Sequence, residues 1–387
     1  MATLLLIIIY LAFISLGLPD SIIGVTWPVM REEFGLSLEY AGYISFVLTV
    51  GTVTSSLLSG YIIAKLKTGL VIVFSIALTV LGLLGFFFAP NLFFILLLAF
   101  PLGFGAGSID TALNNYVANN YESHHMNWLH AFWGVGATAG PIIISFFLID
   151  SSWRNGFLAI AIIQFCFLVI LTLSLPLWKG KKDALIEETP IEKHEDIRKI
   201  KGVTFAIIIF IAYCALEFTV GIWGSSYLVN VKDVIPSNAA RMIALYYGGI
   251  MTGRFISGFI SFRLSNKRLI YLGISIVFIG SIMLISANSI GLITVSFVLL
   301  GMGLAPIFPS MIHETPRNFG KENSQYVIGY QIAAAYLGTA IFPPLLGILA
   351  TKFSISIFPA FVLILAILLL VSVNLLYLRV EKQKHIV

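Results

Sequence analysis

The chain has 387 residues, of which 59% are hydrophobic and only 11% are charged. Soluble domains carry about 25% charged residues, so this composition excludes a soluble enzyme and predicts an all-α membrane protein that crosses the bilayer many times. The net charge of +5 does not indicate nucleic-acid binding, because the basic residues lie in short segments between apolar stretches.

Twelve apolar stretches are long enough to span a bilayer core, which takes about 20 helical residues. The first lacks a basic leader and continues to Met30, so it is interpreted as a span and not as a signal peptide. The predicted spans cover residues 3–30, 39–65, 69–88, 91–120, 127–149, 154–177, 203–230, 238–264, 268–287, 290–314, 323–350 and 355–379.

Residues 178–202 form the only long hydrophilic stretch, with seven basic and six acidic residues. They divide the chain into an N-terminal six-helix half (1–177), a central loop and a C-terminal six-helix half with a short tail (203–387). If both termini are cytoplasmic, inside segments hold 17 Lys and Arg residues and outside segments hold 5. The positive-inside rule therefore predicts cytoplasmic termini and a cytoplasmic central loop. We expect the protein in a cell membrane, such as a bacterial inner membrane.

The two halves repeat each other in sequence. Residues 51–66 read GTVTSSLLSGYIIAKL and residues 249–264 read GIMTGRFISGFISFRL, with nine of sixteen positions identical or similar at an offset of 198. The same offset relates Gly103 to Gly301. A six-helix unit duplicated in parallel is typical of the major facilitator architecture, with two halves related by a pseudo-two-fold axis.

Two acids lie within spans of the first half. Asp20 follows Pro19 in the first span, and Asp110 lies in the run GFGAGSIDTALNNYV of the fourth. On a helix, Gly103, Gly107, Asp110 and Asn114 share one face. Because a charged residue at membrane depth is costly, each acid marks a candidate functional site. We expect Asp20 to take up a proton from outside. We expect Asp110 to bind substrate hydroxyls, to carry the proton, or both, with Asn114 contacting substrate.

The fifth span, NWLHAFWGVGATAGP, presents Asn127 and His130 on one face. Both are candidate substrate-binding residues, and His130 could also modulate a nearby acid. Trp133, close to the same face, could stack on a sugar ring. Plain helix packing is the alternative for each of these residues.

In the second half, Glu217 lies mid-span and is a third candidate proton-coupling acid. Arg254 is a basic residue well inside the eighth span and could neutralise Glu217, although it is expected nearer the cytoplasmic side. Trp223 and Gln331 are candidate substrate contacts, Gln331 because it aligns roughly with His130 across the repeat. Cys166 and Cys214 lie in apolar spans, so neither a disulfide nor a metal site is predicted.

The segment Pro101 to Pro141 resembles the fucose–galactose–glucose:proton symporters of the major facilitator superfamily. The Gly-rich run, Asp110 and Asn114 match the fourth-span pattern of that family, in which Glu is commoner than Asp. Asp20 in GLPDSI matches its first-span acid, and Asn127-Trp128-Leu129-His130 matches the following NLAQ-type segment. The segment LEFTVGIWGSSYL, with Glu217, is similar to the glucose-permease pattern.

The resemblance implies a secondary transporter that couples proton entry to uptake of a neutral sugar. No P-loop is present, so ATP is not expected to drive transport, and the proton is the expected coupling partner in place of any cofactor. Sodium remains an alternative coupling ion. We expect a monomer in the lipid bilayer. One alternative is a proton-coupled efflux antiporter for lipophilic compounds, because GATAGP (136–141) partly matches the antiporter signature. The other is a ligand sensor without transport, which the short central loop disfavours.

Overall fold

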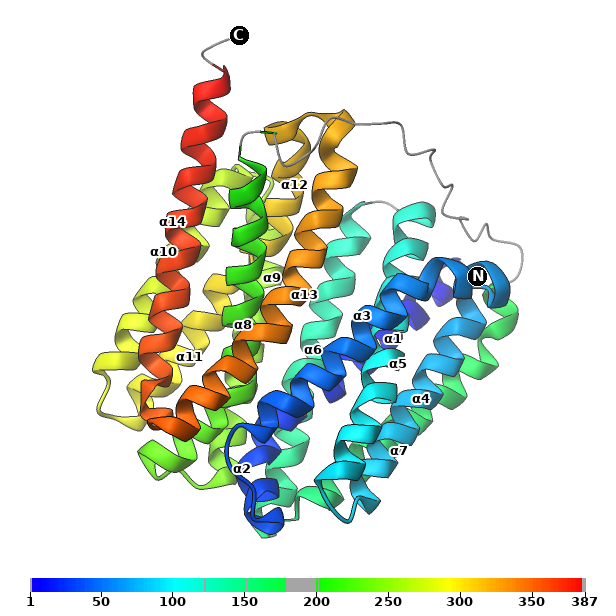
Figure 1. The fold of residues 1–387 in the computed structure, drawn as a ribbon. Helices are drawn as coiled ribbons and strands as arrows, with labels where there is room; N and C mark the ends of the chain where they lie inside the picture. The colour runs from blue at the N-terminus through cyan, green and yellow to red at the C-terminus, as the bar shows by residue number, and fades with distance from the viewer. Residues whose placement is uncertain (1, 122, 151, 179–199, 201, 385–387) are drawn as a thin grey trace.

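The computed structural model describes residues 2–121, 123–150, 152–178, 200 and 202–384. The described residues form helices joined by short turns (Figure 1). The N-terminal half contains α1 (Ala2–Asp20), α2 (Ile22–Phe34), α3 (Tyr40–Leu66), α4 (Thr68–Phe88), α5 (Leu92–Asn120), α6 (Ser123–Phe147) and α7 (Trp153–Leu173). The C-terminal half contains α8 (Val203–Lys232), α9 (Pro236–Ile260), α10 (Asn266–Ser286), α11 (Ile290–Leu304), α12 (Ile307–Phe319), α13 (Lys321–Lys352) and α14 (Phe358–Lys384).

Every predicted span coincides with a helix or a pair of helices, which confirms the all-α membrane fold. Within the described ranges, eleven helical segments are long and apolar enough to cross a bilayer. The helix of the eighth predicted span, α9, has 25 residues but is not among them, since Arg241 and Arg254 make it less apolar. The proposed boundaries of the two halves stay predictions, because residues 179–199 and 201 of the central loop lie outside the described residues.

The packing of the halves repeats as the sequence does. A Cβ added at Gly103 would lie 2.0 Å from the carbonyl oxygen of Leu48, and one added at Gly301 would lie 2.1 Å from that of Tyr246. Both the glycines and the carbonyls are related by the 198-residue offset. Small residues let membrane helices approach closely, so the repeat preserves the backbone contacts α3–α5 and α9–α11.

The first span is broken into α1 and α2 at Ser21, directly after Pro19 and Asp20. Proline has no N–H, so Pro19 cannot bond the carbonyl of Ser15 four residues earlier. Gln164 of α7 replaces this bond: its Nε2 donates to the Ser15 carbonyl, and its Oε1 accepts from the Ser15 hydroxyl, each at 2.5 Å. Gln164 is fully buried. A polar side chain from a neighbouring helix therefore stabilises the break that carries Asp20.

Replacing Gln164 with leucine is expected to destabilise the protein by about 1–2 kcal/mol, because it leaves the Ser15 carbonyl and hydroxyl without this partner. The matched control is Thr172→Leu on the same helix, since the Thr172 hydroxyl bonds only its own helix at Leu168. Thermal unfolding in detergent should show a lower midpoint for Gln164→Leu alone. Equal midpoints for the two variants would contradict this account of the break.

The halves meet chiefly through three helix pairs: α2 with α8, α3 with α13, and α6 with α9. Figure 1 shows them converging near α2 at the lower end and diverging toward the end that carries the C-terminus. At the converging end, Arg31 of α2 donates to Asn230 of α8 at 2.8 Å, and a Cβ at Gly24 would lie 2.2 Å from the carbonyl oxygen of Gly221. The molecule is thus closed at the end where α2 terminates.

The glycines of the GATAGP segment serve helix packing. A Cβ added at Gly136 would lie 2.1 Å from the carbonyl oxygen of Ile14, and one at Gly140 would lie 2.5 Å from that of Leu18. Both contacts join α6 to α1, the helix that ends at Asp20. The resemblance of this segment to an antiporter signature is therefore accounted for by the close approach of α1 and α6.

Candidate substrate and proton site

Asp20 is the last residue of α1 and is exposed, whereas residues 15–19 and 21–28 around it are buried. The Trp133 indole of α6 donates its N–H to Asp20 Oδ2 at 2.8 Å. Gly17, one turn earlier, allows this approach, since a Cβ there would lie 2.1 Å from the Trp133 carbonyl oxygen. Helix packing thus presents a single accessible carboxylate within an otherwise buried stretch of the first span.

Arg254 of α9 joins this pair to the acid of the second half. Its guanidinium lies 5.0 Å from the centre of the Trp133 ring, in cation–π geometry. Its Nη2 is 3.8 Å from Glu217 Oε1 of α8, and its Nη1 donates to the His130 carbonyl at 3.1 Å. Asp20, Trp133, Glu217 and Arg254, here named the central cluster, therefore form a chain of contacts across both halves.

The electrostatics of the central cluster follow from its composition. Arginine stays protonated in proteins, whereas a carboxylate at membrane depth costs roughly 2.5–3.5 kcal/mol or more when it is charged and unpaired. The side chains of Arg254 and Glu217 are only 14% and 9% exposed, so screening by water is weak. One cation and two acids form a neutral cluster when one of the acids holds a proton.

Asp110 of α5 lies in a second polar group. Asn114 Nδ2 donates to both the carbonyl and Oδ1 of Asp110, each at 2.9 Å. The neighbouring Thr111 hydroxyl donates to Ser56 Oγ of α3 at 3.1 Å, and Ser56 Oγ lies 3.3 Å from the Tyr336 hydroxyl of α13. Asp110, Asn114, Thr111, Ser56 and Tyr336 form the α5 cluster, which also joins the halves. It offers a carboxylate, an amide and hydroxyls, which are the groups that hydrogen-bond sugar hydroxyls.

The side chains of the remaining sequence candidates make other contacts than those of the two clusters. The His130 ring packs edge-on against Phe13, with ring centres 5.7 Å apart, and only its backbone contacts Arg254. Trp223 is fully buried and donates to the Pro343 carbonyl at 2.8 Å. Gln331 is also fully buried and accepts from the Thr315 hydroxyl at 3.0 Å. Both lie in helix packing, and their role as substrate contacts stays a prediction. The Asn127 side chain lies outside the described residues.

Several residues that contact or belong to the two clusters were not predicted from the sequence as site residues. Tyr247 packs edge-on against Trp133 at 6.2 Å, and Tyr336 joins the α5 cluster. Their sequence neighbourhoods are ordinary apolar spans, so no signal identified them. Arg254 had a signal, since it is a basic residue well inside a predicted span. One face of the Trp133 ring carries the Arg254 guanidinium, and stacking of Trp133 on a sugar stays a prediction.

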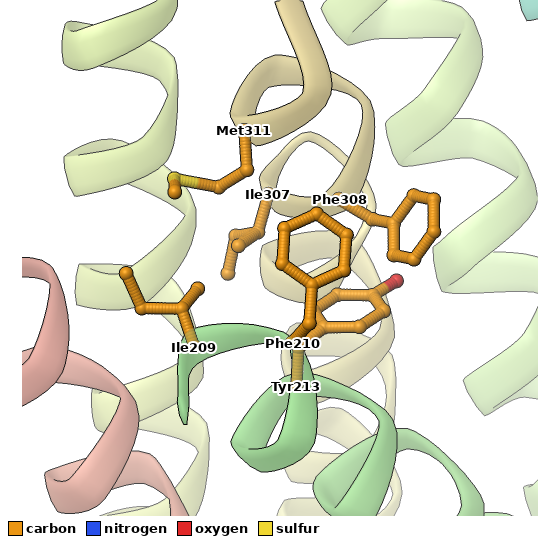
Figure 2. Close-up of a pocket in the computed structure, with 6 residues that line it drawn as sticks. All are labelled: Ile209, Phe210, Tyr213, Ile307, Phe308 and Met311. Atoms are coloured by element: carbon orange, nitrogen blue, oxygen red, sulfur yellow. The ribbon is translucent and has the colours of Figure 1, made fainter. Parts of the chain in front are cut away.

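A small apolar pocket, too narrow to hold a water molecule, lies between α8 and α12 (Figure 2). Its lining is Ile209, Phe210, Tyr213, Ile307, Phe308 and Met311. The Phe308 ring contacts Phe210 edge-on, with ring centres 4.9 Å apart. Phe308 occupies the position of the repeat that Asp110 holds in the first half. The second half thus packs aromatic rings where the first half places a carboxylate, so the polar residues are divided unequally between the halves.

Comparisons with known proteins agree with this architecture. The sequence profile of the Major Facilitator Superfamily matches residues 9–330 and 242–386, so the chain belongs to this superfamily of membrane transporters. It is 24% identical to the glucose/mannose transporter GlcP of Bacillus subtilis over 351 residues, which cover 87% of this chain and 86% of GlcP. These relatives and the fold are those of transporters and not of enzymes.

Two solved structures share the fold. The crystal structure of the transporter FucP in its outward conformation superposes with a TM-score of 0.64 and 16% identity, covering 97% of this chain and 98% of that one. The nucleoside transporter NupG superposes with a TM-score of 0.76 and 12% identity, covering 96% and 99%. The predicted major facilitator fold is therefore confirmed.

Proposed function

We propose that the chain is a symporter that couples inward proton flow to uptake of a neutral hexose or related sugar of the glucose, galactose and fucose class. Its similarity to a transporter named for glucose and mannose supports the substrate class. The α5 cluster supports it chemically, because it gathers a carboxylate, an amide and three hydroxyls between the halves. We propose further that it is a cell-membrane protein with both termini in the cytoplasm.

The observation that carries this proposal is the central cluster. Asp20 is an accessible carboxylate at the contact between the halves, held by Trp133 and therefore linked to Arg254 of the other half. A change in its charge alters interactions across the contact on which alternating access depends. In the proposed cycle Asp20 takes up a proton from outside, and Asp110 and Asn114 bind sugar hydroxyls. The proton and the sugar are released after the halves rock to open the cytoplasmic side.

The test is uptake of labelled glucose, mannose, galactose and fucose into proteoliposomes with an alkaline interior. We expect at least one sugar to accumulate above its external concentration, and accumulation to collapse when a protonophore is added. Replacing sodium with potassium should leave uptake unchanged if the proton is the coupling ion. Folded protein that transports none of the sugars would overturn the proposal, and proton-driven dye efflux would then be measured for the antiporter alternative.

Asp110→Asn is expected to reduce both sugar accumulation and sugar exchange by about tenfold or more, because a hydrogen bond to a charged group contributes about 1.5–3 kcal/mol. The variant keeps the shape of the side chain but removes the charge that accepts from sugar hydroxyls. Exchange is measured as counterflow of labelled sugar without a proton gradient. The control is Asn119→Ala on the same helix, whose amide bonds only Asn115. Normal accumulation by Asp110→Asn would exclude Asp110 from the site.

A further inference from the structure

The two acids of the central cluster stand in different surroundings. Glu217 is buried, and its carboxylate lies 3.8 Å from the Arg254 guanidinium. Asp20 is exposed and is held by a neutral donor, the Trp133 indole. A cation within about 6 Å of a carboxylate favours its charged form, and removing either partner leaves an uncompensated buried charge. The exposed carboxylate can exchange protons with water.

We infer that Arg254 neutralises Glu217 throughout the transport cycle, so that Asp20 alone takes up and releases the coupling proton. This inference rests on the proposed function and assigns separate roles to acids that the sequence groups together. Glu217 is then a fixed counter-ion and Arg254 a positioning residue. One proton is carried per cycle through this cluster, because only one of its acids is free to titrate.

Trp133 keeps Arg254 and Asp20 in contact without a direct ion pair. One face of its ring receives the guanidinium, while its edge donates the indole N–H to the Asp20 carboxylate. An arginine paired directly with Asp20 would hold that carboxylate ionised and prevent proton uptake. Proton uptake by Asp20 therefore requires that Glu217 hold the Arg254 guanidinium on the face of the Trp133 ring, away from the Asp20 carboxylate.

Other ionisable groups surround the cluster, and the pH dependence of transport depends on them as well. Glu217 interacts electrostatically with two tyrosines of α9 and with a tyrosine and a thiol of its own helix. Asp20 interacts in the same way with Glu217, Tyr247 and Asp110, and Arg254 does so with the His130 ring. The groups concerned are Tyr213, Cys214, Tyr246, Tyr247, Asp110 and His130. The tyrosines and the thiol are neutral in the working pH range of a transporter, so the acids and Arg254 dominate the charge balance.

The test compares Glu217→Gln with the double variant Glu217→Gln/Arg254→Gln in proteoliposomes. In the single variant, Arg254 loses its counter-ion and pairs with Asp20. Proton-driven accumulation is then expected to fall by about tenfold or more, while counterflow is retained. In the double variant the cluster holds one acid and no cation. Accumulation should return to within about threefold of the parent, with the parental dependence on pH, because a neutral pair replaces an ion pair at little net cost.

The controls separate this inference from the proposed function. Arg241→Gln removes the other arginine of α9, which lies at its opposite end beside Ser145, and should leave accumulation and its pH dependence unchanged. If the double variant performs counterflow but accumulates as poorly as Glu217→Gln, Glu217 itself carries a proton and the inference is overturned. If the parent protein shows no proton-driven accumulation, the proposed function fails instead. Detergent melting curves identify any variant that does not fold.

Discussion

Replacing Asp20 with asparagine is expected to abolish uphill accumulation of sugar while leaving counterflow intact. Asparagine is nearly the same size and is permanently neutral, so it resembles Asp20 with its proton bound. The loaded carrier can still bind sugar and change conformation, but it cannot be driven by a proton gradient. Both activities are measured in the same proteoliposomes, with and without an alkaline interior. The loss of accumulation should be at least about tenfold, as expected when the charge that drives a coupled step is removed.

Asp150→Asn is the matched control, since Asp150 is exposed in the short 3₁₀ turn after α6 and is distant in sequence from every cluster residue. Trp133→Phe is a second comparison, because it keeps a ring for Arg254 but removes the N–H that bonds Asp20. We expect it to change the pH dependence of accumulation without abolishing it. Accumulation by Asp20→Asn at the parental level would show that the proton is carried elsewhere.

Apolar span length and the 198-residue repeat predict the fold well, because a bilayer admits few solutions other than helices. The repeat even predicts which backbones touch, as the paired approaches of Gly103 to Leu48 and of Gly301 to Tyr246 demonstrate. The least apolar span, α9, is the one that carries Arg254, and its low hydropathy reflects its place in the contact between the halves. The low hydropathy of α9 therefore identifies the helix that carries Arg254 of the central cluster and that packs against the other half.

The partners within the site were harder to predict. Arg254 seemed too near the cytoplasm to reach Glu217, but an arginine side chain extends its charge several ångströms from its backbone, so helix depth alone does not fix the depth of the guanidinium. The sequence selected Gln331 by its alignment with His130 across the repeat and Trp223 by its position after Glu217, and neither criterion specifies which neighbour covers the side chain. The covering residues, Thr315 and Pro343, come from helix arrangements that only tertiary packing determines.

Gly24→Leu is expected to abolish both accumulation and counterflow without unfolding the protein. A Cβ at Gly24 would lie 2.2 Å from the Gly221 carbonyl oxygen and 2.7 Å from the Ile222 Cα, both of them backbone atoms of α8. Backbone atoms cannot rotate aside as a flexible side chain does, so leucine forces α2 away from α8. The closed arrangement of this end becomes inaccessible, and alternating access stops with the proposed outer side open. Loss of counterflow distinguishes this defect from that of Asp20→Asn.

The opening is measured through a cysteine at Ser226, in a background with Cys166→Ser and Cys214→Ala. Ser226 is fully buried and lies one helical turn from both Ile222 and Asn230, which contact α2 through Gly24 and Arg31. A membrane-impermeant maleimide should label this cysteine much faster in Gly24→Leu than in the parent.

Gly291→Leu is the control, because a Cβ at Gly291 meets no atom within 4 Å and leucine fits there without displacing a helix. Equal labelling rates in folded protein would mean that α2 and α8 do not form the closing contact. In that case a leucine at Gly24 would act through local strain, and its effect should then appear as a lower melting temperature with accessibility unchanged.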